Sequence, residues 1–570
     1  MNEKKRDFLI LTLIILLGCF LRFWGIDWGL PYQYQTEEYR VIKYALRMGS
    51  GDLNPHIFQY PSLYLYLMLF LYGCYFLIGK LFGFFSTVTE FAHAYVRDPT
   101  CFFLIGRGSE SVFGLEVIVL TYCIGKKIFS EKVGLISALI CAVLPEFVYK
   151  AHMTKGDTAA IFLGLLFWMS AYNIYLSGKK KYYYLSAIFL GLAFSTKYYM
   201  AFLGIVLLAA HFLSPARTSH KQLLIALILI PLFFFVGTPY AILSPEFFNE
   251  FKVLFFTFST GDTQFWSTVD LSYFLKGLLR AGLNLIKMFD FGPNVLWGNS
   301  GIGVLAIVGL IRMVWVKEPF SLFFILPIVI YWIVIGSFPN PAAGYMAPIF
   351  PLCAVSASYL IFNSKFTKRW IQFTSLFFFL LSVSCGGAES FRLSYVYTLE
   401  DTRTNAKEWV ESNIPKESKI LMDLLPYSPP LEMTAEQLNR FYQISVQQNH
   451  YKKEFFKLKL EVFDPAMVTY HIFVVKRTAI QLGVIPPHLA EVQKVQDLVE
   501  LSGNETDFEL VKKMGIQYVI VNSWAESNAN RYADRIARFN QILTTKGDLL
   551  KVIEPQSSLH PGPVIKIFKI

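Results

Sequence analysis

Charged residues are scarce in this chain. Asp, Glu, Lys and Arg make up 16% of its 570 residues, against roughly 25% in an average soluble domain. Hydrophobic residues account for 54% and aromatic residues for 17%, and the mean hydropathy is +0.44. This composition excludes a disordered chain and argues against a soluble multidomain enzyme. It predicts a multi-pass membrane protein with an attached soluble part.

Cysteine is also sparse, and several common motifs are missing. None of the seven cysteines forms a Cys-x-x-Cys pair, so the sequence indicates neither a zinc site nor a redox site. A Walker loop, a Gly-x-Gly-x-x-Gly turn after a strand and a His-Glu-x-x-His motif are absent as well, which argues against a nucleotide-driven pump. The net charge of +11 is typical of a membrane protein with basic cytoplasmic loops, so no nucleic-acid partner is expected.

Long apolar runs fill the chain up to residue 388. The first, Phe8 to Trp24, follows a basic N-terminus but no small-x-small cleavage site, so we interpret it as a retained span rather than a signal peptide. The runs, among them an uninterrupted one over 133–150, predict an α-helical membrane domain with about 11–13 transmembrane helices.

The distribution of Lys and Arg predicts the topology. Five loops are basic, namely 126–132, 179–181, 217–221, 312–317 and 365–369. The positive-inside rule places all of them in the cytoplasm, provided that the run 61–85 lies along the outer surface instead of crossing. We therefore predict a cytoplasmic N-terminus and a large first outer loop of about 26–103, which includes a juxtamembrane helix at 61–85.

From Thr398 onward charges become frequent, and no apolar run is long enough to span a membrane. The pattern predicts a helix over 405–413 and strands over 419–424, 469–475, 517–521 and 564–570. The chain thus divides into a transmembrane domain, 1–397, and a C-terminal α/β soluble domain, 398–570, which an odd number of crossings places outside the cytoplasm.

Several ionisable residues fall on the outer side of this topology. Two adjacent carboxylates, Glu37 and Glu38, follow the first span, and a carboxylate there can serve as a general base or be an ordinary solvated loop residue. Arg107, Asp157 and Lys197 lie at the outer ends of later spans, where ionisable groups are candidates for function. As alternatives, Arg107 could pair with Glu110 three residues along its helix, and Lys197 could extend to the membrane surface.

Short motifs follow one another in a defined order along the chain, each at one position. In chain order they are Glu37-Glu38, Gly51-Asp52-Leu53-Asn54-Pro55, Tyr60-Pro61, Arg107, Gly125-Lys126-Lys127, Pro145 with His152 and Asp157, Gly191 to Tyr198, Gly237-Thr238-Pro239-Tyr240, Tyr345 with Pro348, and Asp401-Thr402-Arg403. With this order the sequence resembles the polyprenyl-phosphate-dependent glycosyltransferases of the GT-C fold, in particular the bacterial relatives of the protein O-mannosyltransferases and the lipid A aminoarabinose transferases.

The resemblance implies inverting transfer of a sugar from a polyprenyl-phosphate donor to a hydroxyl of a protein, lipid or glycan acceptor, at the outer membrane face. It also implies a location in the cytoplasmic (inner) membrane of a bacterium. It assigns the catalytic base to Glu37, with Glu38 beside it. Binding of the donor phosphate falls to Arg107 and Lys197. Orientation of the sugar or acceptor is implied for the remaining matches, which are Asp157, His152, Tyr345 and Asp52.

The chain departs from the family pattern at three points. Gln35 and Thr36 stand where the family has His-Pro, Glu37 stands for its Asp, and Gly344 precedes Tyr345 where a basic residue is frequent. The departure at Gln35, Thr36 and Glu37 supports one alternative, a non-catalytic relative in envelope assembly. A flippase for lipid-linked glycans is a second alternative. The spacing of the acidic and histidine side chains has no metal signature, so no metal ligand is assigned and a divalent metal stays an open alternative.

Overall fold

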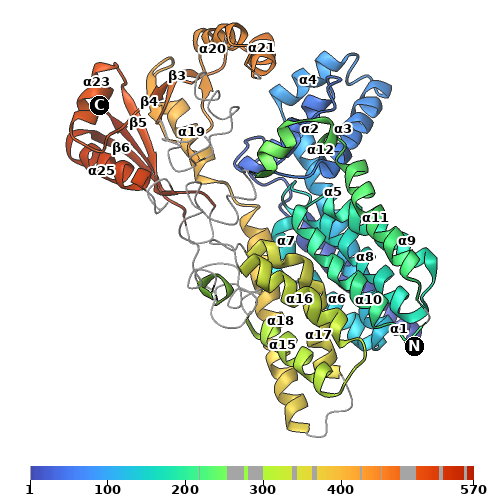
Figure 1. Cartoon of the computed structure of the whole chain (residues 1–570). Helices are drawn as coiled ribbons and strands as arrows, with labels where there is room; N and C mark the ends of the chain where they lie inside the picture. The colour runs from blue at the N-terminus through green and yellow to red at the C-terminus, as the bar shows by residue number, and fades with distance from the viewer. Residues whose placement is uncertain are drawn as a thin grey trace. The chain divides into compact units, whose positions relative to one another are not determined.

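The structure, a computed structural model, describes most of the chain (Figure 1). The described residues are 2–216, 218–252, 275–279, 300–336, 343–362, 369–423, 427–450, 452–475, 496–524, 531–556 and 561–570. They form two compact units. The first comprises Met1–Ile26, Arg40–Gly73 and Leu104–Tyr395, and the second comprises Asp27–Tyr39, Cys74–Phe103 and Val396–Ile570. The division 1–397 and 398–570 stays a prediction, and segments of the first outer loop enter both units.

The first part of the chain is helical. Its elements are α1 (Glu3–Phe23), α2 (Thr36–Met48), α3 (Leu63–Leu81), α4 (Val88–Arg97), α5 (Thr100–Ile128), α6 (Glu131–Ala142), α7 (Pro145–Ala151), α8 (Asp157–Ser177), α9 (Lys180–Phe194), η1 (Tyr198–Gly204), α10 (Ile205–Phe212), α11 (His220–Gly237), α12 (Tyr240–Leu243), α15 (Ser300–Trp315), α16 (Ser321–Gly336), η2 (Ala343–Ile349), α17 (Phe350–Phe362) and α18 (Arg369–Val396).

Within the described residues, five helices are long and apolar enough to cross a membrane, or six if the bent pair α6–α7 is one span. They are Leu63–Leu81, Asp157–Ser177, His220–Gly237, Gly344–Phe362 and Phe373–Val396. Three shorter apolar helices accompany them. The chain is therefore a multi-pass membrane protein, as predicted. The full number of spans and the surface placement of 61–85 stay predictions, because α3 has the length and composition to cross.

The apolar run 133–150 is a broken helix rather than the single span that the sequence predicts. α6 and α7 meet at an angle of 58°. Pro145 opens α7, where its missing N–H costs nothing, and the preceding residue is forced into an extended conformation. The break leaves the last carbonyls of α6 without partners in their own helix. Arg22 of α1 donates to two of them, those of Cys141 and Ala142, at 3.0 Å each.

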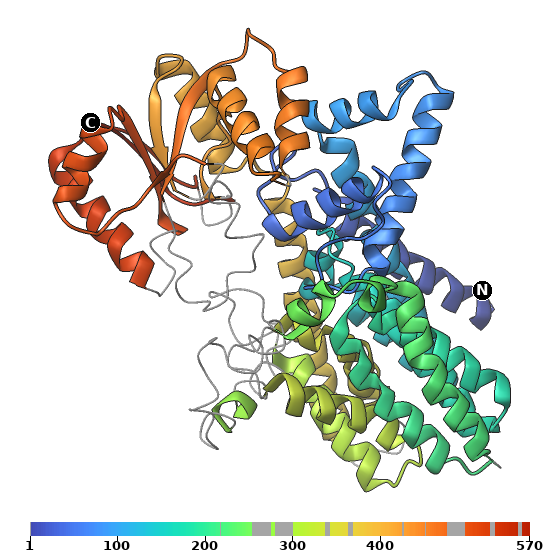
Figure 2. The ribbon, with the colours of Figure 1, turned by 45° about the horizontal axis from the view of Figure 1, so that its top comes forward.

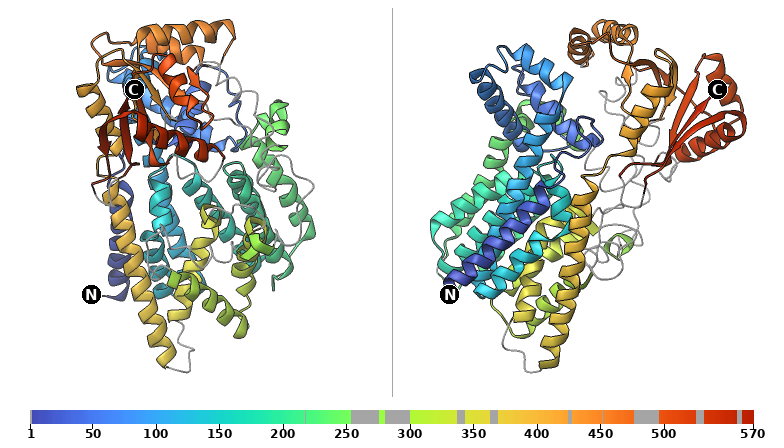
Figure 3. Two further views of the ribbon diagram at one scale, coloured as in Figure 1. Left: turned by 90° about the vertical axis from the view of Figure 1, so that its left-hand side faces the viewer. Right: turned by 180° about the vertical axis from the view of Figure 1, so that it is seen from behind.

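The remaining helices of the first unit pack closely around an apolar core. Figures 1 and 3 show α8, α9 and α11 running side by side. At Gly191 of α9, an added Cβ would lie 2.6 Å from the carbonyl oxygen of Ile230 in α11, so only glycine permits this approach. The end of α18 lies along α1, where the Ser394 hydroxyl donates to the Leu21 carbonyl at 2.7 Å (Figure 3).

The second unit contains a mixed β-sheet. Its elements after residue 398 are α19 (Thr402–Asn413), β1 (Lys419–Met422), β2 (Glu432–Met433), α20 (Ala435–Gln447), α21 (Lys453–Glu461), β3 (Thr469–Val475), β4 (Leu498–Val499), α23 (Thr506–Lys513), β5 (Tyr518–Asn522), α25 (Arg531–Lys546), β6 (Asp548–Ile553) and β7 (Ile565–Lys569). The strand order is β2-β3-β1-β5-β7-β6, with β4 paired to β3. Only the pairs that involve β7 are antiparallel. The predicted α/β fold is confirmed.

Helices cover both faces of this sheet, because alternate strand residues point to opposite sides. On one face, Ile420 and Ile520 pack against Val410 of α19. On the other, Leu421 packs in a core with Phe539 of α25, and Figure 2 shows α25 in red along the sheet.

Candidate active site

The first unit holds a buried group of charges at the start of α8. The Asp157 carboxylate lies 2.9 Å from Lys150 Nζ through Oδ2 and 3.0 Å from Lys197 Nζ through Oδ1. All three residues are less than 10% exposed. Two cations from different hairpins thus hold the two oxygens of one carboxylate. Two of the predicted site residues, Asp157 and Lys197, are in direct contact.

A second carboxylate and two aromatic rings extend this charged cluster. Glu146 lies 3.3 Å from Lys150, one helical turn before it on α7. The Tyr199 hydroxyl donates to Asp157 at 3.3 Å, and its ring contacts that of Tyr345 at 5.6 Å between centroids. The predicted residue Tyr345 therefore reaches the charged cluster through Tyr199.

The structure gives Lys197 and Gly344 defined neighbours in the same cluster. Lys197 Nζ lies 4.9 Å from the centroid of the Tyr60 ring, a favourable cation–π distance. The alternative that Lys197 extends to the membrane surface does not match its burial at 8% exposure. At Gly344, an added Cβ would lie 3.2 Å from Glu146 Oε1 and 3.3 Å from Lys150 Nζ. Any larger residue at position 344 would therefore crowd the Glu146–Lys150 pair.

The position of Asp157 is set by the start of its helix. Gly156 precedes it with φ +78°, in the left-handed region that favours glycine. Glu110 of α5 accepts hydrogen bonds from the backbone N–H groups of Gly156 at 2.9 Å and Thr158 at 3.0 Å. A carboxylate bonded to the first N–H groups of a helix also complements the helix dipole. Glu110 therefore holds the backbone turn that sets the direction of the Asp157 side chain.

Two further predicted residues bond to backbone groups near the end of α1. Arg107 donates to the carbonyl of Ile26 at 2.7 Å. His152 lies with Nε2 3.1 Å from the Trp24 carbonyl and Nδ1 2.8 Å from that of Val148. Both side chains are buried, at 2% and 0% exposure. These contacts fix the polar end of α1 against α5 and α7, and the phosphate and orienting roles of Arg107 and His152 stay predictions.

Asp52 belongs to a separate contact group on the surface. Its Oδ2 lies 2.8 Å from His56 Nε2, and His56 Nδ1 lies 3.0 Å from Glu246 Oε2. His56 thus links the first outer loop to the segment after α12. The hydrogen bond from His56 holds the pKa of Asp52 below its ordinary value. The orienting role of Asp52 stays a prediction.

This link should depend on pH. A lowered pKa in the folded state means that the stabilisation is complete above the ordinary carboxyl pKa and is lost as pH falls through the lowered value. We expect His56→Gln to speed amide hydrogen exchange of residues 52–59 at pH 7 by about two- to fivefold, because exposed ion pairs contribute at most about 1 kcal/mol. The difference from wild type should shrink as pH falls below the ordinary carboxyl pKa and the Asp52 carboxylate becomes protonated. A difference independent of pH would contradict the ionic link.

The predicted base and its neighbour lie at the start of α2 in the second unit. Glu37 is exposed and Glu38 is fully buried. The Gln35 carbonyl accepts from the Tyr39 N–H at 3.2 Å, which closes the first turn of this helix. Of the two carboxylates, Glu37 is the exposed one, and its role as base stays a prediction.

Sequence reasoning missed two members of the charged cluster, Glu146 and Lys150. Both lie in the run 133–150, whose apolar composition predicts an uninterrupted span. A signal was present, because the two residues have the i, i+4 spacing of a helical ion pair inside a predicted span.

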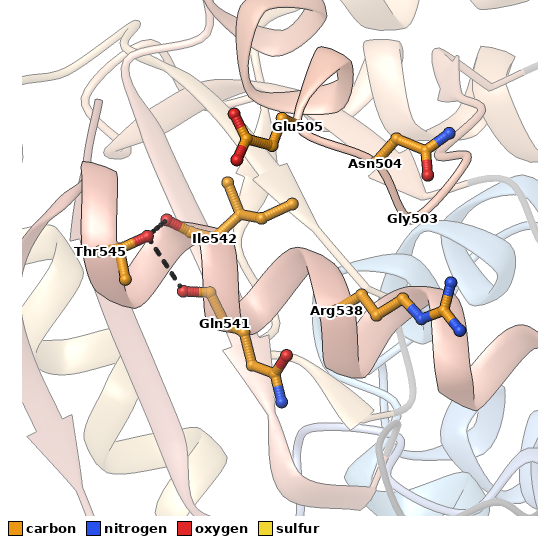
Figure 4. A pocket seen from close by; sticks show the side chains of 7 residues that line it. All are labelled: Gly503, Asn504, Glu505, Arg538, Gln541, Ile542 and Thr545. Atoms are coloured by element: carbon orange, nitrogen blue, oxygen red, sulfur yellow. Dashed lines mark hydrogen bonds between the residues drawn. The ribbon is translucent and has the colours of Figure 1, made fainter.

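Other possible sites in the described residues do not match the predicted chemistry. No group of three or more His, Cys, Asp or Glu side chains in these ranges could hold a metal ion. In the sheet-containing part, an open pocket lies between the turn 503–505 and α25 (Figure 4). Its lining includes Arg538 and Glu505, and Glu505 pairs with Lys546 on the surface at 2.9 Å.

Comparison with solved structures finds several weak matches. ArnT from Cupriavidus metallidurans bound to undecaprenyl phosphate is 11% identical, with 98% of this chain and 97% of that chain covered and a TM-score of 0.46. The archaeal oligosaccharyltransferase AglB from Archaeoglobus fulgidus, in complex with an inhibitory peptide and a dolichol-phosphate, is 12% identical. There 96% of this chain and 73% of that chain are covered, with a TM-score of 0.48. These scores describe a weak likeness, from which no residue role is taken.

Comparison with protein families matches one part of the sequence. No curated protein matches the chain. Residues 107–240 match the family described as dolichyl-phosphate-mannose-protein mannosyltransferase. This stretch contains Arg107, Asp157 and Lys197, together with Glu146 and Lys150. The match covers this part of the chain only, and it confirms the resemblance predicted from the motifs.

Proposed function

We propose that this protein transfers a sugar from a polyprenyl-phosphate donor to an acceptor hydroxyl at the outer face of the membrane, with inversion at the anomeric carbon. The observation that carries the proposal is the convergence of Lys150 and Lys197 on Asp157 inside an apolar helical unit, within the stretch that matches the mannosyltransferase family. Buried charges among apolar helices are costly and mark sites of function.

The lysines are suited to bind the phosphate of the donor. An ammonium group has three N–H donors, so each lysine can hold one oxygen of Asp157 and still donate to a phosphate oxygen. Arg107 is proposed as a third cation from the family resemblance. When the bond between the anomeric carbon and the phosphate oxygen breaks, the electron pair stays on the departing polyprenyl phosphate. Cations held in place stabilise this growing negative charge.

The proposed base is Glu37. Its carboxylate takes the proton of the acceptor hydroxyl, whose oxygen then forms a bond to the anomeric carbon on the face opposite the departing phosphate. Attack from that face inverts the configuration. Orientation of the sugar and the acceptor is proposed for the other residues of the motif set, namely Glu38, Asp52, His152, Asp157 and Tyr345.

The partners follow from this reaction. The donor is a sugar on polyprenyl phosphate, its chain lies in the bilayer, and the acceptor is a hydroxyl of a protein, lipid or glycan. The proposed orientation keeps the basic loops in the cytoplasm and the α/β domain outside it, in the inner membrane of a bacterium. The same assay, run with and without a divalent metal ion, tests whether transfer requires one.

Lys197→Met tests the phosphate site. We expect sugar transfer to fall by about a hundredfold or more, because loss of one fixed donor to a transition-state charge typically costs that much. The assay measures transfer from radiolabelled polyprenyl-phosphate sugars in membranes that contain the variant. Lys126→Met is the matched control, because it removes a lysine that pairs with Glu131 at 2.8 Å on the surface. The control should transfer as wild type does.

Two outcomes would contradict the proposed function. Equal transfer by Lys197→Met and wild type would remove Lys197 from the phosphate site. Absence of transfer by folded wild type with every donor of the panel, in membranes supplied with an acceptor extract, would favour the flippase or the non-catalytic relative.

A further inference from the structure

The first stretch of the outer loop packs against the α/β part of its own unit. The Tyr34 residue is 9% exposed, and its ring contacts two groups. One is Gly29, where an added Cβ would lie 2.7 Å from the ring. The other is the Arg403 guanidinium of α19, whose carbon is 3.8 Å from the ring centroid. Gly29 has φ +65°, so close approach and backbone conformation both require glycine there.

Arg403 is itself held firmly in place. Asp401 accepts from its Nε at 2.7 Å and from its Nη2 at 2.6 Å, which is a bidentate pair. A second ring, that of Trp524 after β5, lies 5.1 Å from the guanidinium carbon. Arg403 is 3% exposed. A planar guanidinium fixed at its edge by a carboxylate and stacked on its face by a tyrosine has little freedom to move.

Three further contacts join the same two segments. The Tyr34 hydroxyl lies 2.7 Å from Thr404 Oγ1. Trp28 stacks on Tyr397, with ring centroids 5.1 Å apart. The ammonium of Lys407 lies 5.8 Å from the Tyr32 ring centroid. The loop is thus attached along its length to the segment 397–407, and Arg403 lies at the centre of the attachment.

The attached stretch leads directly into the helix that carries the proposed base. Tyr34 is two residues before the start of α2, and Glu37 is in the first turn of that helix. The only residue between Tyr34 and α2 is Gln35, whose carbonyl closes this turn. The position of Tyr34 therefore limits where the Glu37 carboxylate can lie.

We propose that Arg403 is a positioning residue for the sugar transfer: through its stack on Tyr34, it fixes the start of α2 and so the Glu37 carboxylate. This inference rests on the proposed function for its catalytic consequence, and it gives the α/β domain a part in the reaction. A misplacement of about 1 Å can cost a hundredfold in rate, so the contact has a measurable effect on kcat.

The test compares four variants of the full chain in lipid nanodiscs. Arg403→Lys keeps the charge but loses the planar stack and the bidentate pair, and Tyr34→Leu removes the ring. Tyr34→Phe keeps the ring and removes only the hydroxyl. Arg440→Gln is the matched control, because it breaks another Arg–Asp pair of the same unit, that with Asp497.

Two quantities are measured, hydrogen exchange of the peptide 27–39 without any donor and transfer kinetics with the donor that wild type uses. For Arg403→Lys and Tyr34→Leu we expect exchange of this peptide to rise about tenfold, kcat to fall at least about tenfold, and KM for the donor to stay within about twofold. Exchange of the strand 469–475 should not change. Arg440→Gln should match wild type, and Tyr34→Phe should lie close to it.

Unchanged exchange of 27–39 in Arg403→Lys would overturn the proposal, and so would raised exchange with an unchanged kcat. The exchange measurement contains no sugar donor, so it is independent of the role assigned to Glu37. If Glu37→Gln transfers as wild type does while Arg403→Lys still raises exchange, the assignment of the base fails and the attachment of the loop stands.

Discussion

Asp157→Asn should abolish sugar transfer and destabilise the protein at the same time. Asn has nearly the same shape but leaves the ammonium groups of Lys150 and Lys197 without the carboxylate that they share. Removal of one partner from a buried ion pair costs about 3–5 kcal/mol, because the remaining charge is left uncompensated. Transfer should fall by about a hundredfold or more, since the two lysines proposed to bind the donor phosphate lose their common anchor.

The two effects are measured by unfolding in detergent and by transfer from radiolabelled donors. Glu131→Gln is the matched control, because Glu131 pairs with a lysine at 2.8 Å on the surface and its loss should cost less than about 1 kcal/mol. Asp157→Glu retains the charge and should recover most of the stability. An Asp157→Asn variant that unfolds and transfers as wild type does would exclude the proposed cluster.

Arg22→Met should also destabilise the helical unit strongly. Arg22 is 0% exposed and donates to the carbonyls of Gly18, Cys141 and Ala142 at 3.0–3.1 Å. Methionine fills similar space but leaves the end of α6 without these donors, at about 1–3 kcal/mol for each buried carbonyl. Relief of the buried charge acts in the opposite direction. Because apolar surroundings supply no water to the carbonyls, we expect a net loss of about 3 kcal/mol.

Arg6→Met provides a control in the same helix, because Arg6 pairs with Asp7 at 3.1 Å with its side chain 48% exposed. Its free energy of unfolding should change by less than about 0.5 kcal/mol. A similar free energy of unfolding for Arg22→Met and Arg6→Met would show that the break between α6 and α7 needs no donor from α1.

Much of the fold could be predicted because its signals are local. Runs of β-branched and aromatic residues predicted the strand over 469–475, which has these bounds in the structure. The strand β6 was missed because it is largely exposed and lacks an alternating pattern. The break at Pro145 was missed because apolar composition marks a span without defining its axis.

The candidate site was predicted only in part, because local sequence shows where charged residues lie but not which of them meet in the fold. Charges at the ends of apolar runs identified Asp157 and Lys197, and these prove to be in contact. Lys150 lies in the middle of an apolar stretch in the sequence, and only the bend after α6 turns it toward Asp157. The attachment of Tyr34 by Arg403 joins residues 369 positions apart in the chain, and no local pattern connects them.

The central claim is that this chain transfers a lipid-linked sugar with Glu37 as base. The most direct test measures transfer from a panel of radiolabelled polyprenyl-phosphate sugars in membranes that contain wild type or Glu37→Gln, with an acceptor extract supplied. The account predicts transfer from at least one donor by wild type, and a loss of about a hundredfold or more in the variant, because general base catalysis contributes about that factor. Equal transfer by both proteins, or no transfer by folded wild type above empty membranes, would contradict it.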